Sequence, residues 1–169
     1  TYFEGRAEVR GWVVADRAVE GRTADALEQL RWALETGTDP VLVTAALATA
    51  VRLLARLSGV PHGVRDADVA RDLEVPPWKV RMLRGQLRGW TPTGLVRAVR
   101  AVAAADLAVK GGGNDPTLAL TTALLEIGAA EHPRRKTIHG AAGQRNARHA
   151  KRRQRLDRRM RRAIAANDG

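Results

Sequence analysis

The sequence of 169 residues contains no cysteine and only 4% aromatic residues. Without cysteine the chain can form neither a disulfide nor a thiolate-bound metal site, which excludes a small secreted scaffold held by disulfides. The longest apolar stretch, residues 41–57, is broken by Arg52 and Arg56, so we expect no membrane-spanning segment, which needs about 18 apolar residues in a row. The start has no basic-then-apolar signal pattern, and we expect a cytoplasmic protein.

The net charge of +11 is confined to one end of the chain. Residues 1–133 contain 16 basic and 16 acidic residues, whereas residues 134–169 contain 13 basic residues and only two aspartates. The basic pI of the whole chain therefore describes the C-terminal tail and not the folded body. Because the tail has little periodic apolar character, we expect it to be disordered or partly helical when alone in water.

The body is predicted to be all-α, a bundle of about six or seven helices followed by the basic tail. Alanine, leucine and arginine are abundant, and these residues lose little on entering a helix. Thr23 is expected to cap one helix, and the pairs Asp39-Pro40 and Asp115-Pro116 are typical of helix starts. The expected helices cover residues 12–20, 23–36, 40–57, 66–74, 76–88, 93–109 and 116–130.

Four sequence features occur in order along the chain: a short helix ending in AVEGR, an apolar helix led by proline, a helix start PPWKV, and an ADLAVKGG stretch followed by Asp-Pro. With the opening TYFEGRAEVRGW they cover residues 1–131. Together they resemble the C-terminal part of the delta subunit of DNA polymerase III, a component of the bacterial replicative clamp loader, in the form found in high-GC actinobacteria. Each feature alone is weak, and the ordered combination carries the resemblance.

The resemblance implies a collar domain that holds the subunits of the loader together while the loader places the sliding clamp on primed DNA. Such a delta subunit lacks competent ATPase motifs and would be a non-catalytic subunit of a DNA-directed DNA polymerase holoenzyme, a nucleotidyltransferase complex. The implied partners are the other clamp-loader subunits, with DNA reached through the complex or through the tail. No membrane, small-molecule substrate or cofactor is implied.

The expected organisation has three parts. Residues 1–20 are the end of a preceding module with a lead-in helix, and their AEVR run is expected to be a strand or extended. Residues 21–133 are the helical collar-like domain, and residues 134–169 are the tail. The chain lacks an initiator methionine and reads as entered in mid-sequence, so we expect it to extend upstream of Thr1.

A basic helix face is the main candidate for contact with a partner subunit or with nucleic acid. Residues 77, 81, 84 and 88 fall on one face of the helix that starts with PPWKV, next to a tryptophan. A solvated face, with the tryptophan packed on a neighbour, is the simpler interpretation. The candidate contacts are Trp78, Lys79, Arg81, Arg84, Arg88 and, at the end of a later helix, Lys110.

Catalytic and metal chemistry find no support in the sequence. A phosphate cradle needs glycines leading from a strand into a helix, but residues 111–113 follow Lys110 at the end of a helix and are typical of a C-cap and turn. No nucleophile has an adjoining base. The four histidines lie in expected loops or the tail without a ligand spacing, so no metal site is predicted: His62, His132, His139 and His149.

The tail offers an alternative function, that of a small basic nucleic-acid-binding protein. Its arginines would neutralise phosphates and give salt-sensitive, non-specific binding, and a disordered extension with incidental affinity is equally favoured. It has no aromatic residues for base stacking. The short helices expected at residues 66–74 and 76–88 could be misread as a helix-turn-helix. The candidate phosphate contacts are Lys151, Arg152, Arg153, Arg155, Arg158 and Arg159.

Overall fold

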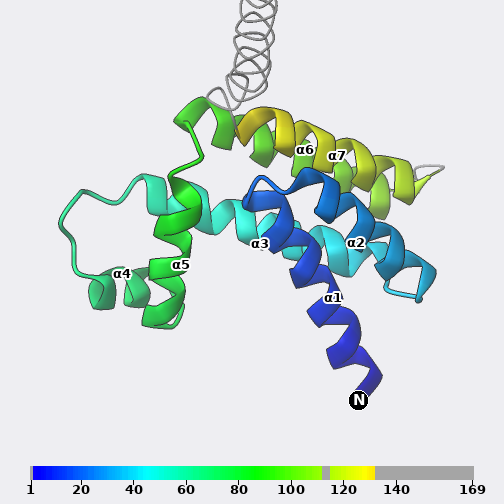
Figure 1. The fold of residues 1–169 in the computed structure, drawn as a ribbon, viewed down its shortest axis with the longest axis horizontal. Coiled ribbons are helices and arrows are strands. Elements are labelled where there is room, and N and C mark those ends of the chain that lie inside the picture. Colours follow the sequence, from blue (N-terminus) through cyan, green and yellow to red (C-terminus); the bar gives the residue numbers. More distant parts are fainter. Residues whose placement is uncertain (1, 112–114, 132–169) are drawn as a thin grey trace, which may run out of the picture. The chain divides into compact units, whose positions relative to one another are not determined.

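Seven helices make up the computed structural model, which describes residues 2–111 and 115–131 (Figure 1). They are α1 (Tyr2–Val19), α2 (Thr23–Glu35), α3 (Pro40–Ser58), α4 (Asp66–Leu73), α5 (Pro77–Leu87), α6 (Pro92–Lys110) and α7 (Pro116–Glu131). That part of the chain contains no strand, so the prediction of an all-helical bundle of six or seven helices is confirmed. The basic tail lies outside the described residues.

Helix α3 is the central element of the bundle. It packs against α1, α6, α5, α4 and α7, and Leu47 and Leu54 on it are fully buried. Each such leucine contributes about 1.5–3 kcal/mol through removal of its side chain from water. The helix is long and apolar enough to cross a membrane by composition alone. Its place among five other helices accounts for that composition, because a helix that is apolar on most sides is usually a core helix.

The expected helix starts at Asp39-Pro40 and Asp115-Pro116 are confirmed, and Thr91 caps α6 in the same way. The Asp39 side chain accepts from the backbone N–H of Val41 at 2.8 Å, and Thr91 Oγ1 accepts from the N–H of Gly94 at 3.0 Å. Asp115 does the same for Leu118 at 3.0 Å. These bonds satisfy N–H groups that have no partner inside their helix.

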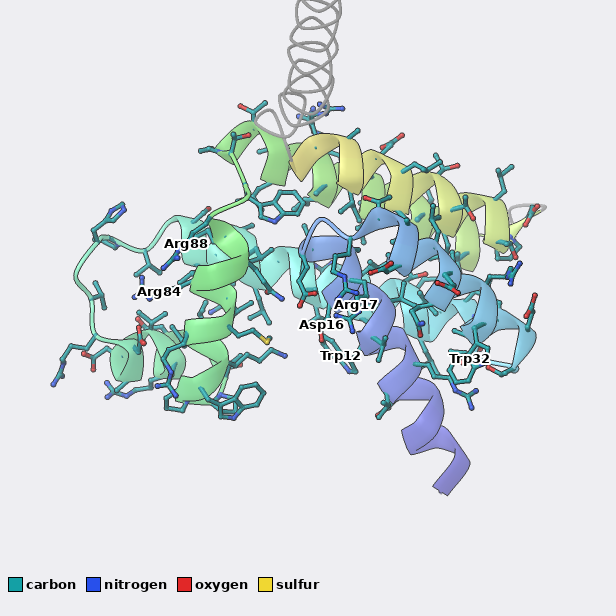
Figure 2. All side chains as sticks on the ribbon, viewed as in Figure 1. Trp12, Asp16, Arg17, Trp32, Arg84 and Arg88 are labelled. Carbon is teal, nitrogen blue, oxygen red and sulfur yellow. The ribbon has the colours of Figure 1, made fainter. Side chains whose placement is uncertain are left out.

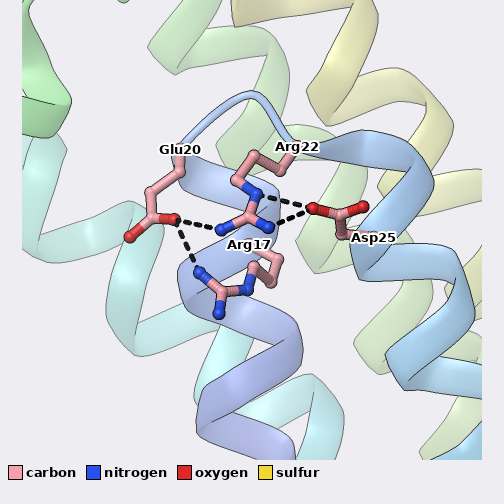
Figure 3. A network of polar contacts seen from close by, with 4 residues as sticks. All are labelled: Arg17, Glu20, Arg22 and Asp25. Carbon is pink, nitrogen blue, oxygen red and sulfur yellow. Dashed lines mark hydrogen bonds and ion pairs between the residues drawn. The ribbon is translucent and has the colours of Figure 1, made fainter.

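Helix α2 begins differently from the prediction, which was wrong about Thr23 as the cap. The N-cap residue is Arg22, without a side-chain cap bond. The Thr23 side chain instead lies against Gly128 of α7, where an added Cβ would approach Thr23 Oγ1 to 2.1 Å. Arg22 Nε donates to Asp25 at 2.6 Å, and its guanidinium also lies 3.9 Å from Glu20 (Figure 3).

The N-terminal residues also differ from the prediction. The AEVR run, expected to be a strand or extended, lies within α1. Nearer its C-terminal end this helix buries Val14, Ala15 and Ala18 in the common core and packs on α2 and α3. A short run of mixed residues has no clear period of its own, and the continuing helix decides its conformation.

The end of α4 stores backbone strain at Glu74. This residue has φ +58°, and the N–H groups of Glu74 and Val75 bond back to Arg71 and Ala70, which is the pattern of a helix closed by a left-handed residue. Glycine is the usual residue at such a position because a Cβ costs about 1–2 kcal/mol in the left-handed region. The left-handed conformation of Glu74 therefore destabilises the folded chain, and a glycine at this position would remove the strain.

Replacing Glu74 with glycine is expected to raise the free energy of unfolding by about 1 kcal/mol, after the larger chain entropy of glycine is subtracted. Urea unfolding followed by circular dichroism measures the change. The matched control is Glu74→Ala, which removes the same carboxylate but keeps a Cβ and should gain nothing. Equal stability of the two variants would contradict the strain at this residue.

Candidate partner-binding surfaces

The outer face of α5 presents an exposed tryptophan and two free arginines. Trp78 is 58% exposed, and Arg81 and Arg88 are exposed. Neither arginine makes an ion pair or side-chain hydrogen bond within residues 2–111 and 115–131. Tryptophan and arginine are the residues most often found at the energetic centre of interfaces, so this face is chemically suited to a partner.

Arg84 lies one helical turn from Arg81 and from Arg88, but its environment differs from theirs. Its Nε lies 2.9 Å from Asp66 Oδ1, and its Nη2 donates to the Val64 carbonyl at 3.0 Å (Figure 2). The guanidinium thus joins α5 to the first residue of α4 and to the loop before it. Of the three arginines expected on one basic stripe, the structure leaves Arg81 and Arg88 available and engages Arg84 within the fold.

Lys79 faces α1 and not the outer side of α5. Its Nζ lies 4.8 Å from the centroid of the Trp12 ring, a cation–π contact worth about 0.5–1 kcal/mol at a partly exposed site. Asp16 lies one turn further along α1 and is half-buried. The charge of Lys79 is close enough to affect its pKa. Burial raises the pKa of Asp16 above its ordinary value of 3.8, an effect that the Lys79 ammonium partly offsets.

The raised pKa gives a pH-dependent prediction for Asp16→Asn. Since the folded state binds the Asp16 proton more tightly than the unfolded state, Asp16 makes the wild type less stable as the pH rises above about 3.8, the unfolded value. The asparagine variant is therefore expected to be more stable than the wild type at pH 7, with the gain vanishing at pH 3. Thermal unfolding at both pH values tests this, and a variant less stable at pH 7 would contradict it.

A groove of about 280 Å³ runs between α3 and α6. Lys110, the last predicted contact, lines it, but its ammonium pairs with Asp106 of the same helix at 2.9 Å, so it is not a free cation. The remaining lining is mostly small or apolar. We call this the α3–α6 groove, defined by its lining residues Ala45, Ala48, Thr49, Val51, Arg52, Val99, Val102, Ala103, Asp106 and Lys110.

An exposed apolar stripe on α6 borders and enters this groove. Val96 is 50% exposed, Val99 36% and Leu107 74%, and Ala103 between them is also exposed. Their spacing of three, four and four residues places them on one side of the helix. We call these four residues the α6 stripe. Single exposed apolar residues are ordinary on a protein surface, but a continuous stripe beside a groove indicates a binding site.

The sequence-based interpretation missed the α6 stripe. On this helix it named Lys110 as the candidate contact and no apolar residue, whereas the structure buries Leu95, Ala98 and Val102 and leaves the α6 stripe exposed. Placing the apolar positions around the helix would have shown two adjacent apolar faces. A helix needs only one such face to join a bundle, so the second was the available signal.

The described surfaces carry apolar and basic side chains that are suited to binding a partner. Among residues 2–111 and 115–131, no group of three His, Asp or Glu side chains is placed to hold a metal ion. The tail residues predicted to contact phosphates, from Lys151 to Arg159, lie outside the described residues. An apolar stripe, a groove, and exposed tryptophan and arginine are features that protein interfaces use.

Comparison with known proteins identifies the family. The sequence profile of the DNA polymerase III delta subunit, C-terminal domain, matches residues 12–127, and the chain belongs to this family. The matched range begins within α1 and ends within α7. The resemblance to the C-terminal part of the delta subunit, which the sequence motifs indicated, is confirmed. No curated protein sequence matches.

A solved structure supports the same fold. The Bacillus subtilis DNA clamp loader delta protein (YqeN) superposes with a TM-score of 0.60 at 20% sequence identity, over 73% of this chain. The chain spans 37% of the length of that protein. At this identity the likeness establishes the helical fold, and the activity of the whole protein is a matter for proposal.

Proposed function

We propose that this domain is the helical collar of a clamp-loader delta subunit, of the actinobacterial type that its motifs resemble. It attaches delta to the other subunits of the loader while the assembled loader places the sliding clamp on primed DNA. The domain itself performs no chemistry, and the protein works in the cytoplasm. The α6 stripe carries the proposal, because the described part of the charge-balanced bundle leaves this apolar surface exposed.

The energy of the contact comes from burying the α6 stripe. Burying apolar surface contributes about 25 cal/mol per Å² removed from water, before the entropy of association is subtracted. Charged residues at the rim contribute less and mainly set orientation. Trp78, Arg81 and Arg88 on α5 form a second proposed contact surface, separate from the α3–α6 groove, for a subunit or for DNA.

The proposed organisation keeps three parts. Residues 1–20 continue from a preceding module, residues 21–133 form the collar, and residues 134–169 are an appended basic segment. Since α1 packs on α2 and α3, the lead-in helix also serves as the first helix of the bundle.

Reconstitution tests the proposal. The 169-residue chain is mixed with the remaining clamp-loader subunits of the same organism, purified together without delta, and the mixture is separated by size-exclusion chromatography. The chain is expected to elute with the complex at physiological salt. Elution of the two components apart at micromolar concentration would contradict the proposal.

The tail supports a second candidate function, non-specific nucleic-acid binding. All of the excess charge lies in residues 134–169. In a neutralised variant, glutamine replaces Lys151, Arg152, Arg153, Arg155, Arg158 and Arg159. If the alternative is correct, this variant loses DNA binding together with every other partner. If the collar proposal is correct, it still elutes with the loader subunits.

A further inference from the structure

One cation in the α3–α6 groove has no partner. Arg52 is exposed and forms no ion pair or side-chain hydrogen bond with any of the residues that the structure describes. The other two charges in the groove, Asp106 and Lys110, neutralise each other at 2.9 Å. The groove therefore has a net charge of one positive unit, and it comes from Arg52.

The surroundings of Arg52 suit protein better than a small molecule or nucleic acid. Val99 and the alanines of the lining provide exposed apolar surface, whereas Val51 and Val102 line the groove but are almost fully buried. Small side chains let the backbone of another element approach closely. The volume of about 280 Å³ is at the lower limit of pockets for drug-sized ligands, which hold about 300–1,000 Å³. A nucleic-acid strand would bring many phosphates to a site with one free cation and a carboxylate.

The α6 stripe extends the same surface along the helix. Val99 and Ala103 belong to both the stripe and the groove, so a docked element would contact them together. Apolar contacts spaced along one helix are the mark of a helix lying in a groove. A guanidinium beside such contacts is best matched by a carboxylate, to which it can bond through two N–H groups.

We propose that the α3–α6 groove receives an amphipathic helix of a neighbouring loader subunit, which sets an aspartate or glutamate against Arg52 and small apolar side chains against Val99 and Ala103. This rests on the proposed function of the α6 stripe and adds the chemistry of the partner. The carboxylate fixes the register of the docked helix, because only one position along the groove offers it a free cation.

The test measures the affinity of Arg52 variants for the delta-free complex of loader subunits. Arg52→Glu is expected to weaken binding by more than tenfold and Arg52→Gln by several-fold. Raising the salt concentration should reduce the difference in affinity between the wild type and Arg52→Gln. The matched control is Arg31→Glu on α2, an exposed arginine whose side chain pairs with Glu35 at 3.6 Å, and it should bind like the wild type. Equal thermal unfolding of all variants excludes loss of folding.

The outcomes separate this inference from the proposed function. If the wild type binds and Arg52→Glu binds as tightly as Arg31→Glu, the carboxylate inference is overturned while the collar function stands. If the wild type does not bind the delta-free complex at all, the carboxylate inference and the collar function are both overturned. If the chain alone forms a dimer that Arg52→Glu dissociates, the occupant is a second copy of this chain, and the inference is overturned as well.

Discussion

Alanine at position 94 is expected to lower the free energy of unfolding by about 2–3 kcal/mol, although alanine is the better helix former. A Cβ added to Gly94 would lie 2.5 Å from the carbonyl oxygen of Ala130, which belongs to the backbone of α7. That oxygen can move only with its helix, so α6 and α7 must separate. Chemical unfolding monitored by circular dichroism measures the loss.

Gly85→Ala is the matched control. Gly85 lies within α5, and nothing is within 4 Å of the place that its Cβ would occupy. Here the ordinary preference for alanine should prevail, with a gain of up to about 1 kcal/mol. Opposite signs for the two variants support the close approach of α6 and α7. If Gly94→Ala is as stable as Gly85→Ala, that packing is wrong.

A glutamate at position 107 is expected to weaken binding of the chain to the other loader subunits by roughly thirtyfold or more, which corresponds to the loss of about 2 kcal/mol typical of an interface hot spot. Leu107 is 74% exposed at the end of the α6 stripe, so the variant folds normally but would bury an unpaired charge on docking. Titration of the delta-free complex with fluorescently labelled chain measures the affinity.

Leu118 on α7 supplies the control for this substitution. It is the same residue type, 62% exposed, and it lies outside both the α6 stripe and the α3–α6 groove. Leu118→Glu should leave the affinity within about twofold of the wild type, as surface changes away from an interface usually do. A larger loss of affinity for Leu118→Glu than for Leu107→Glu would indicate that the docking surface lies on α7 instead.

Much of the fold could be predicted from local signals. The Asp39-Pro40 pair marks the start of α3 because the aspartate accepts the first free N–H and the proline has none to lose. Gly37, with φ +82°, follows the end of α2, where a glycine adopts the left-handed conformation without strain. Helix α3 is apolar on most of its surface, which is the pattern of a central helix, and five other helices pack on it.

The remaining features depend on contacts between distant residues. Thr23 has a good capping side chain, but its packing against Gly128 decides its role, and no local pattern reports that contact. The Trp90 indole donates to the Val19 carbonyl at 3.1 Å across 71 residues of sequence. In the same way Arg84 was placed correctly on its helix, and only the fold shows its bond to Asp66.

Photo-crosslinking from position 103 tests directly whether a loader subunit docks at the α3–α6 groove. A photo-reactive amino acid replaces exposed Ala103 in the α3–α6 groove, and in a second protein it replaces exposed Thr122 on α7. Each protein is mixed with the delta-free loader complex and irradiated. If the groove is the docking site, position 103 is expected to crosslink to a loader subunit, and position 122 is expected to give few crosslinks. Crosslinks from position 122 with none from position 103 would contradict docking at the groove.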